Sequence, residues 1–364
     1  MSEKYLSHTK WMKRAIFLAS LGKNTTSPNP RVGAVILDKK GNLISEGFHY
    51  MAGTSHAEAM AFNNLKKDPK GGSMYVNLEP CCHQGKTPPC VDKIISSGIR
   101  NVYISIQDPD KRVSGRGIKL LKKAGIQVHL GLCKKESSEL NKDFIHRNIT
   151  KKAFGVLKWA MSIDGRVGLK NGKSKWITNE ESRSLVHTLR AEFDAIIIGG
   201  NTLRKDNPIL TTRGSKNIEP LRVVFTKTLD LPAKSNLWDC NVAKTLVIYD
   251  SSTANKEFLA RIPKCVEVAK VSADNPELIS KLLAKRGCNK VLWECGPKLA
   301  TAAIKSGCIN EIISFIAPKI IGGEISMNPF GDFEFREMHE IIKLSDSQVS
   351  LIGNDICVKS SFRY

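Results

Sequence analysis

The chain reads HAEAM at residues 56–60 and NLEPCCHQGKTPPC at residues 77–90, which brings two histidines, two glutamates and three cysteines close together in sequence. A cluster of this composition can be a small disulfide-bonded motif, a structural zinc site or a reaction centre. HAEAM opens a helix-like segment, and NLEP ends a strand-like one. Of the 10 cysteines in the chain, only Cys81, Cys82 and Cys90 cluster, which disfavours a disulfide-bonded motif.

His56, Cys81 and Cys90 can supply one imidazole and two thiolates to one Zn²⁺ ion per chain. Three protein ligands leave the fourth position for water, which is typical of a catalytic site, whereas a structural site fills all four positions. Glu58 follows His56 by two residues and can face that water without binding the metal, so it can carry a proton. This order of residues follows the H-x-E…P-C pattern of zinc deaminases.

Two neighbours of the expected ligands have other roles in this interpretation. Cys82 could replace Cys81 as a ligand, but Pro80 stands directly before Cys81, which fits the motif better. Glu79 is expected to fix the loop by hydrogen bonds rather than to take part in the chemistry.

The remaining cysteines favour a reduced, cytoplasmic protein. In the first 20 residues, apolar positions mix with Lys and Arg at helical spacing, which indicates a helix rather than a signal peptide. Without a secretion signal, the scattered thiols are expected to be reduced. They show no paired spacing and comprise Cys133, Cys240, Cys265, Cys288, Cys295, Cys308 and Cys357.

Length and composition indicate a globular protein of two domains. A chain of 364 residues is too long for one ordinary core. Its 41% hydrophobic and 25% charged content is normal for such proteins, and no run approaches the ~18 apolar residues of a membrane span. The net charge of +21 suits phosphorylated small substrates or nucleic acid, or it is diffuse surface charge.

Strands and helices alternate in the first half, which predicts a three-layer α/β domain. Lys40–Gly41 is the expected turn of a hairpin, and Thr54 or Ser55 is the expected cap of a helix. The predicted strands are residues 31–37, 42–50, 71–80, 101–109 and 126–132, and the predicted helices are residues 55–67, 90–98, 115–125 and 135–150.

The pattern starts again after residue 150, so a boundary is placed at 148–152, between domains of residues 1–150 and 151–364. Asn179 is the expected cap of a helix over residues 179–193. Several apolar runs have the length of buried strands. The predicted strands begin in residues 154–168, where a strand runs into a turn, and continue with 194–200, 221–226, 245–250, 265–270, 290–296 and a last strand over 311–321, with helices at 275–287 and 297–307.

Eight residues separate Cys81 from Cys90, where many nucleobase deaminases have C-x-x-C. Together with this spacing, the order of motifs along nearly the whole chain resembles the bifunctional deaminase–reductases of riboflavin biosynthesis. The motifs are TTSPNPRVGAVI (25–36), QDPDKRVSGRG (107–117), KWAMSIDGRVG (158–168), SKWIT (174–178), DAIIIGGNTLRKDNPILTTR (194–213), ECGPKLA (294–300) and APKIIGG (317–323).

The resemblance implies an α/β fold class, with an N-terminal cytidine-deaminase-like three-layer domain and a C-terminal dihydrofolate-reductase-like domain. The first domain would hydrolyse the exocyclic amine of 2,5-diamino-6-(5-phosphoribosylamino)pyrimidin-4(3H)-one. Asp110 stands where the family often has Asn, and an acid near a phosphate would repel it. The positions that match substrate contacts are Asn29, His49, His83, Lys86 and Asp108.

The second domain would use NADPH to reduce the ribosyl side chain of 5-amino-6-(5-phosphoribosylamino)uracil to ribityl, by hydride delivery to C1′. It lacks the G-x-G-x-x-G fingerprint, so a Rossmann fold is not indicated. Lys227 is expected to face the 2′-phosphate of the cofactor. The other cofactor positions are Ala160, Trp176, Thr202, Asp206 and the helix start of Gly296, Pro297, Lys298, Leu299, Ala300, Thr301 and Ala302, which can hold a phosphate.

The substrate positions of the second domain include two arginines suited to a phosphate by their planar forks. Asp164 is either structural or close to the reacting sugar. The full set matched by the resemblance is Ser174, Arg190, Leu210, Arg213 and Glu294.

Other functions are less well supported by the sequence. A nucleic-acid deaminase would need aromatic residues interleaved with basic ones for base stacking, which the chain does not offer, and it would leave the second domain unexplained. A zinc-stabilised binding module predicts four ligands rather than three and a nearby glutamate. We expect a homo-oligomer with no nucleic-acid or membrane partner.

Overall fold

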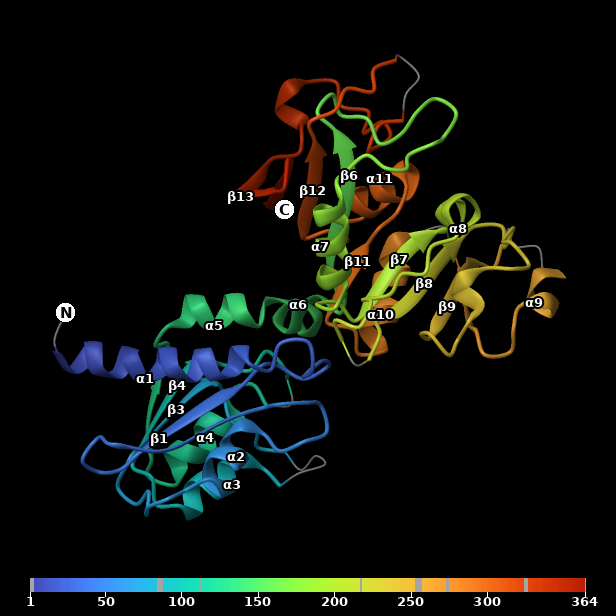
Figure 1. Cartoon of the computed structure of the whole chain (residues 1–364). Coiled ribbons are helices and arrows are strands. Elements are labelled where there is room, and N and C mark those ends of the chain that lie inside the picture. Colours follow the sequence, from blue (N-terminus) through green and yellow to red (C-terminus); the bar gives the residue numbers. More distant parts are fainter. Residues whose placement is uncertain are drawn as a thin grey trace. The chain divides into compact units, whose positions relative to one another are not determined.

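The computed structural model describes residues 3–83, 88–111, 113–216, 218–252, 257–272, 275–323 and 327–363. The chain divides into two compact units, Met1–Thr150 (unit 1) and Lys151–Tyr364 (unit 2). Figure 1 labels the elements of both units. Among the described residues, no helix has the length and apolar character needed to cross a membrane.

Unit 1 is built on a five-stranded sheet with the order β2-β1-β3-β4-β5. The hairpin of β1 (Gly33–Leu37) and β2 (Leu43–Phe48) is antiparallel, as predicted, and β1 also pairs antiparallel with β3 (Ser73–Leu78). β4 (Asn101–Ile106) and β5 (Gln127–Leu130) extend the sheet in parallel with β3. The carboxyl ends of β3, β4 and β5 therefore lie at one edge.

Helices cover both faces of this sheet and give the three predicted layers. Alternate residues of β1 face different cores, because side chains point to opposite faces of a strand. Val35 packs with α1 (Glu3–Ser20), whereas Ile36 packs with α2 (Ala57–Asn63) and α3 (Cys90–Ser96). Figure 1 shows α1 and α5 on one face and α2, α3 and α4 on the other. The bounds of the remaining helices are α4 Arg116–Lys123, α5 Lys134–Leu140 and α6 Lys142–Thr150.

A row of aromatic rings fixes α1 to the sheet. Tyr75, Tyr103 and His129 occupy paired positions on β3, β4 and β5, and their neighbouring ring centroids are 4.6 and 4.5 Å apart. His8 of α1 bonds through Nδ1 to the Tyr75 hydroxyl at 2.6 Å and through Nε2 to the Tyr103 hydroxyl at 3.2 Å. Each phenol thus has a polar partner although it lies under a helix.

Two expectations about helices in unit 1 are wrong. Helix α2 begins at Ala57 with His56 as N-cap, so neither Thr54 nor Ser55 caps it. The single helix expected over residues 135–150 is broken at Asn141. The Asn141 side chain, 1% exposed, accepts from Arg31 N at 2.8 Å and donates to Arg31 O at 2.9 Å.

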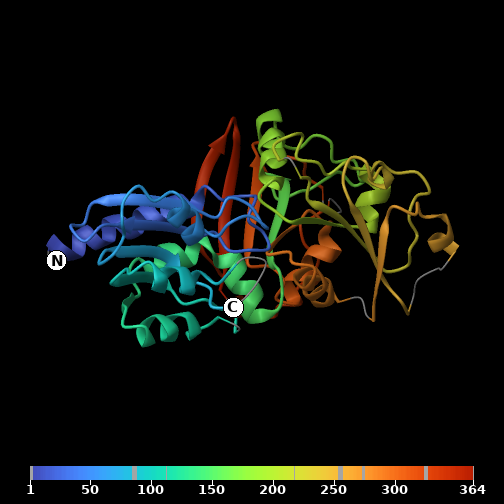
Figure 2. The same cartoon turned by 90° about the horizontal axis from the view of Figure 1, so that it is seen from below.

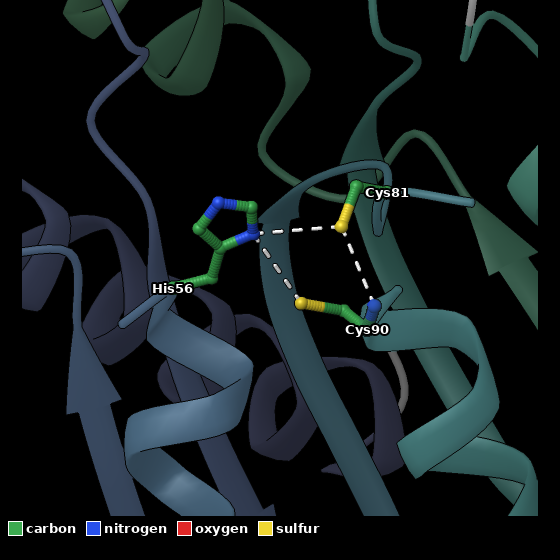
Figure 3. Close-up of side chains that lie close together, drawn as sticks. All are labelled: His56, Cys81 and Cys90. Carbon is green, nitrogen blue, oxygen red and sulfur yellow. Dashed lines mark hydrogen bonds between the residues drawn. The ribbon is translucent and has the colours of Figure 1, made fainter. Parts of the chain in front are cut away.

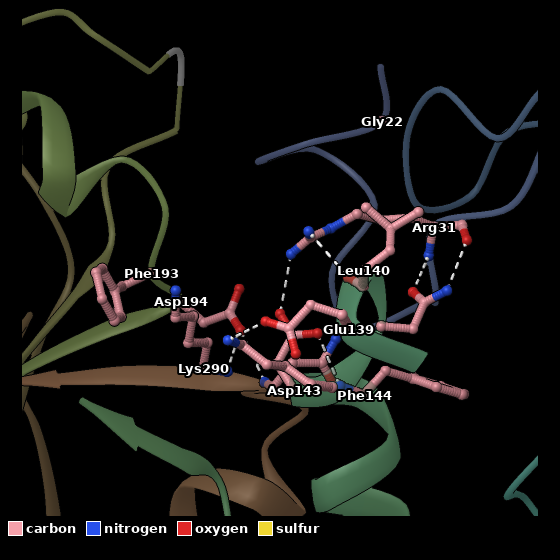
Figure 4. Close-up of polar contacts among 12 residues, drawn as sticks. Gly22, Arg31, Glu139, Leu140, Asp143, Phe144, Phe193, Asp194 and Lys290 are labelled. Atoms are coloured by element: carbon pink, nitrogen blue, oxygen red, sulfur yellow. Dashed lines mark hydrogen bonds and ion pairs between the residues drawn. The ribbon is translucent and has the colours of Figure 1, made fainter. Parts of the chain in front are cut away.

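The same break anchors the side chain of Arg31. Its guanidinium donates to Leu140 O at 3.1 Å and to Asp143 Oδ2 at 3.0 Å (Figure 4). These tertiary bonds outweigh the preference of the local sequence for one continuous helix. They also fix the backbone that leads from Asn29 into β1.

Unit 2 contains a nine-stranded sheet with the order β10-β9-β8-β7-β11-β6-β12-β14-β13. The strands from β10 to β12 are parallel, and the last two pair antiparallel. The bounds are β6 Phe154–Ser162, β7 Ala195–Gly199, β8 Leu221–Thr226, β9 Thr245–Asp250, β10 Glu267–Val271, β11 Lys290–Trp293, β12 Glu311–Ala317, β13 Leu344–Ile352 and β14 Asp355–Phe362.

Apolar clusters lie on both faces of this sheet. One contains residues of α7 (Glu180–Arg190) and the 3₁₀ turn Asn236–Trp238, and the other contains residues of α10 (Pro276–Lys285) and α11 (Pro297–Lys305). Asn179 caps α7 as predicted, since its side chain accepts from Ser182 N. The other helical elements are α8 Gly200–Asp206, α9 Glu257–Arg261 and the 3₁₀ turn Met338–Glu340.

The fold does not end with the strand expected over residues 311–321. β12 stops at Ala317, and the hairpin of β13 and β14 follows (Figure 2, red). β13 is exposed along nearly its whole length, so it lacks the alternation of apolar and polar residues that would predict a strand. The run at 265–270 forms the edge strand β10, which is mostly exposed rather than buried.

Not all scattered cysteines are free thiols. The structure joins Cys240 to Cys265 in a disulfide, although reduced thiols were expected throughout. Both sulfurs lie 3.7 Å from the carbonyl oxygen of Trp238. Residues 25 apart in sequence meet because the chain folds back after the Asn236–Trp238 turn, a tertiary effect that spacing alone does not reveal.

Candidate active sites

The three expected metal ligands of unit 1 meet at one point. His56 directly precedes α2, Cys81 follows β3, and Cys90 is the first residue of α3. His56 Nδ1 lies 3.4 Å from Cys81 Sγ and 3.5 Å from Cys90 Sγ, and the three ligand atoms lie within 4.8 Å of one another (Figure 3). Tetrahedral zinc with ordinary Zn–N and Zn–S bonds separates such atoms by about 3.6 Å. The donor set and its spacing therefore fit a zinc ion.

Backbone contacts hold the sulfurs in this arrangement. Cys90 N donates to Cys81 Sγ at 3.3 Å, and Val91 N donates to Cys81 O at 3.2 Å. Hydrogen bonds from Cys90 and His56 lower the pKa of the Cys81 thiol, which favours the thiolate that a metal needs. Cys82 instead packs against the apolar cluster of unit 1 and is not among the three convergent residues.

Glu58 lies in the first turn of α2, beside the three ligands. Its side chain is 4% exposed. Burial, reinforced by the charge of Cys81, raises the pKa of Glu58 to about 7. A carboxyl group in this place can both accept and donate a proton near neutral pH.

Asn29 and His49 form a second polar pair near the ligands. His49 Nδ1 lies 3.0 Å from Ser55 O, and because a carbonyl only accepts, this nitrogen carries the proton. Nε2 then accepts from Asn29 Nδ2 at 3.1 Å. Burial lowers the pKa of His49, so the ring is neutral. Its centroid is 5.7 Å from that of His56.

The remaining substrate positions of unit 1 follow the ends of β3 and β4. Asp108 is 8% exposed, burial raises its pKa to about 7, and its Oδ1 accepts from Asp110 N at 2.8 Å. His83 Nδ1 is buried without a hydrogen-bond partner in the described part of the chain. Lys86 lies outside the described residues. The predicted role of Glu79 in fixing the loop is confirmed, since its carboxylate accepts three backbone N–H bonds.

In unit 2, the expected cofactor and substrate residues gather at the carboxyl ends of four adjacent parallel strands, β8, β7, β11 and β6. Ligands bind at this edge in open α/β sheets. Lys227 follows β8, Thr202 lies on α8 directly after β7, Glu294 follows β11, and Ala160 lies near the end of β6. Asp206 ends α8 and is exposed.

Glu294 is the centre of a charge cluster. Its oxygens accept from Arg190 Nε at 2.7 Å and Arg190 Nη2 at 3.1 Å, and Lys158 Nζ lies at 3.5 Å. Burial opposes ionisation, but the charges of Arg190 and Lys158 outweigh it and lower the pKa of Glu294 to about 2. The guanidinium fork of Arg190, expected to bind a phosphate, is thus already engaged by a carboxylate. Arg213 is exposed.

The start of α11 has the geometry of an anion site. Gly296 is the N-cap and Pro297 the first helical residue, and no side chain caps the helix. The free backbone N–H groups of a first turn can bind phosphate. Ala300 and Thr301 are buried, and Thr301 Oγ1 donates to Pro297 O at 2.9 Å, so both side chains face the protein. Lys298 is exposed, whereas Leu299 and Ala302 are half-buried.

Other expected residues of unit 2 lie in the loops. Trp176 is 64% exposed, and the Arg183 guanidinium lies 4.5 Å from its ring centroid. Ser174 is half-buried, and the Leu210 side chain is buried in the apolar core. Asp164 accepts from Ser162 Oγ at 2.5 Å and Gly322 N at 2.7 Å, which indicates a structural role.

Two residues of the charge cluster were not singled out from the sequence. Lys158 bridges to Glu294, and His187 Nδ1 lies 3.2 Å from Arg190 Nη1. Lys158 offers a signal, since it is a charged residue inside an otherwise apolar strand, where a lysine needs a partner. His187 is one helical turn from Arg190 and gives no such signal.

Comparisons with known proteins cover both units. Residues 6–106 match the cytidine and deoxycytidylate deaminase zinc-binding region, and residues 153–358 match the RibD C-terminal domain. The riboflavin biosynthesis protein RibD of Synechocystis is 41% identical over 351 residues, covering 96% of this chain and 95% of the relative. That of Aquifex aeolicus is 38% identical over 349 residues, covering 96% of each.

Two solved structures are similar over their whole length. RibD of Acinetobacter baumannii has a TM-score of 0.88 at 30% identity, covering 99% of this chain and 100% of that one. The diaminohydroxyphosphoribosylaminopyrimidine deaminase/5-amino-6-(5-phosphoribosylamino)uracil reductase of Thermotoga maritima has a TM-score of 0.85 at 32% identity, with the same coverage. The predicted fold class is confirmed.

Proposed function

Because this chain belongs to the RibD family of riboflavin biosynthesis, whose members are bifunctional deaminases and reductases, we propose that it carries out both steps on one phosphorylated pyrimidine. Unit 1 deaminates 2,5-diamino-6-(5-phosphoribosylamino)pyrimidin-4(3H)-one. Unit 2 reduces the product, 5-amino-6-(5-phosphoribosylamino)uracil, at its ribosyl side chain. The observation that carries the proposal is the convergence of His56, Cys81 and Cys90 beside the buried carboxyl group of Glu58.

For the deamination, His56, Cys81 and Cys90 would hold a zinc ion, which would supply water activated for attack at neutral pH. Glu58 holds and moves a proton on its carboxyl group beside these residues, which suits a group whose pKa is raised to about 7 by burial. Asn29 and neutral His49 orient the pyrimidine ring by hydrogen bonds.

The anionic end of the same substrate is held by the loop after β4. Asp108 lies there with Asp110, and His83 follows the metal ligand Cys81 by two residues. Lys86, which stands between Cys81 and Cys90 in sequence, is the further expected contact. Burial raises the pKa of Asp108 to about 7, so its protonated form is available near neutral pH and can donate to the ribose or phosphate instead of repelling it.

For the reduction, NADPH supplies a hydride to C1′ of the opened sugar. The start of α11 binds cofactor phosphate through backbone N–H groups, and Thr202, Asp206, Trp176 and Ala160 complete the cofactor site. Lys227 binds the 2′-phosphate, which favours NADPH over NADH. Its charge also acts on Asp250 at the end of the neighbouring strand.

The substrate of the reductase lies against the charge cluster and the nearby loops. Glu294 is ionised and held by Arg190 and Lys158, so it can accept hydrogen bonds from sugar hydroxyls in a fixed orientation. Exposed Arg213 binds the phosphate, and Ser174 and the backbone of Leu210 contact the rest of the molecule.

Product analysis tests this proposal directly. The phosphorylated diaminopyrimidinone is incubated with the zinc-loaded protein, with and without NADPH, and products are separated by chromatography. We expect ammonia and the ribosylaminouracil phosphate without cofactor, and the ribityl compound only with it. Absence of ammonia release would contradict the deaminase assignment. Ammonia release without ribityl product in the presence of NADPH would contradict the reductase assignment.

A further inference from the structure

Three segments of unit 1 meet at the carboxylate of Glu79, the residue directly after β3. Its Oε2 accepts from Asp108 N at 3.2 Å and Gly115 N at 2.9 Å, and its Oε1 accepts from Ile118 N at 3.1 Å. The side chain is 3% exposed, so water cannot easily replace it as an acceptor. Removing the acceptor would leave buried N–H groups without partners, which is costly.

Two of these N–H groups belong to the start of α4. Gly115 is its N-cap and has no side chain to cap the helix, and Ile118 is its third residue. Glu79 therefore supplies, from a distant strand, the acceptor that Ser, Thr or Asp would normally supply locally. Its negative charge also faces the positive end of the helix. The position of α4 is thus tied to a residue two places before Cys81.

Close packing strengthens this tie. A Cβ added at Gly117 would lie 2.4 Å from Pro80 O and 3.2 Å from Glu79 Oε1. Only glycine lets the first turn of α4 approach so closely the backbone of residues 79–83, the segment after β3 that carries Cys81 and that we call the metal loop. Glu79 and Gly117 are two independent features that fix the same junction.

The third N–H group belongs to Asp108, in the loop over residues 107–115 that joins β4 to α4. β3 and β4 are neighbouring parallel strands, so this loop and the metal loop extend from the same edge of the sheet, where ligands bind. The loop carries exposed Lys111 and leads to Arg116, whose charge acts on Cys82 beside the metal ligand. These cations suit an anionic group of the ligand.

We propose that Glu79 is a positioning residue for the deamination, which sets the distance between the metal ligands and the loop that binds the substrate phosphate. The inference rests on the proposed function and gives a structural reason why the deaminase would prefer a phosphorylated substrate. A pyrimidine with a ribosyl phosphate is aligned only when both of its ends are held at the correct separation. A pyrimidine without the phosphate gains nothing from that separation.

The test compares Glu79→Gln with the wild type in the full chain. The amide keeps the size of the side chain, but its NH₂ group cannot accept a bond from a backbone N–H. The kcat and KM of deamination are measured for the phosphoribosylaminopyrimidine and for its dephosphorylated nucleoside, together with zinc content and reductase activity. Glu46→Gln is the matched control, since it breaks only the exposed pair with Arg14 in the same unit.

We expect Glu79→Gln to retain zinc and reductase activity and to lose roughly 10- to 100-fold in kcat/KM on the phosphorylated compound, mainly through KM. The nucleoside should change little, so the preference for the phosphate falls at least about 10-fold. If Glu79→Gln loses its zinc or all deamination, Gly117→Ala becomes the deciding variant. It displaces α4 from the segment after β3 while Glu79 is kept, and it should likewise reduce the preference for the phosphorylated compound.

An unchanged preference in the deciding variant would overturn the inference, because a merely structural residue affects both compounds equally. If the variant's preference is unchanged but the wild type prefers the phosphorylated compound, the proposed function stands and only the role of Glu79 is refuted. A wild-type protein that deaminates neither compound would overturn the proposed function and this inference with it.

Discussion

The candidate sites of the two units differ in how the chain assembles them. In unit 1, the three expected metal ligands come from residues 56–90, and their ligand atoms lie within 4.8 Å of one another. In unit 2, residues from Lys158 to Gly296 are gathered by the carboxyl ends of adjacent parallel strands. The first site depends on side-chain identity, and the second depends largely on sheet topology and backbone N–H groups.

This difference follows from the chemistry that each site performs. A metal requires particular donor atoms at fixed distances, so few residue types can serve. A nucleotide cofactor can be bound by backbone groups and a helix start, which almost any sequence can supply. A single substitution at the metal site of unit 1 should therefore abolish zinc binding or deamination. A single substitution in unit 2 should cause a smaller, partial change in stability or KM.

The largest effect is expected for Cys90→Ser. The variant should lose its zinc, and deamination should fall by more than about 10⁴-fold, because the attacking water loses the metal that lowers its pKa. Metal analysis and ammonia release measure this, and Cys82→Ser, outside the convergent set, should keep both zinc and activity. Unchanged zinc stoichiometry in Cys90→Ser would refute the ligand assignment.

A somewhat smaller effect is expected for Glu58→Gln, which keeps the shape of the side chain but removes its proton transfer. Deamination should fall by about 10²–10⁴-fold, while zinc content and the reduction of pre-deaminated substrate stay unchanged. Ammonia release at a rate close to that of the wild type would show that Glu58 is not the acid–base group.

The charge cluster of unit 2 gives a prediction about stability. Glu294→Gln removes the partner of buried Arg190 and half-buried Lys158, so the free energy of unfolding should fall by about 3–5 kcal/mol. Because the folded pKa of Glu294 is lowered to about 2 from 4.5, its contribution is present above pH 4.5 and is lost as the pH falls through about 2.

Urea unfolding followed by far-ultraviolet circular dichroism between pH 7 and pH 2 measures that contribution. The variant should lack the acid-dependent loss that the wild type shows in unit 2. Glu277→Gln, which breaks solvent-accessible pairs with Lys281 and Lys152, should cost much less, because water screens such pairs. Equal losses in both variants would argue against a special role for the buried cluster.

The smallest effect is expected for Lys227→Ala. A hydrogen bond to a charged group is worth about 1.5–3 kcal/mol, so KM for NADPH should rise by about 10-fold or more, with little change for NADH, which lacks the 2′-phosphate. Steady-state kinetics with both cofactors measures the ratio. Equal changes would refute the assignment of Lys227 and leave the reductase activity standing.

Local sequence predicted most elements of both sheets and the convergence of His56, Cys81 and Cys90, because short-range patterns and donor chemistry determine them. It did not predict the break at Asn141, which depends on hydrogen bonds to Arg31, more than a hundred residues earlier. Nor did it predict the engagement of Arg190 by Glu294. Each miss involves a partner distant in sequence.

The edge hairpin and the disulfide were missed for related reasons. β13 is exposed on both faces, so no apolar alternation marks it. The pairing of Cys240 with Cys265 appears only once the chain folds back after the Asn236–Trp238 turn. A sequence pattern reports burial on one side of an element, and neither β13 nor the disulfide depends on such burial.

The stacked rings under α1 make unit 1 optically distinct from unit 2. Tyr75 and Tyr103 are held parallel at 4.6 Å, and His8 and His129 both stack on Tyr103. Rigidly held rings of this kind give near-ultraviolet circular dichroism only while tertiary packing persists. Of the 5 tryptophans, only Trp11 lies in unit 1. Tyrosine dichroism and tryptophan fluorescence can therefore follow the melting of each unit within a single unlabelled sample.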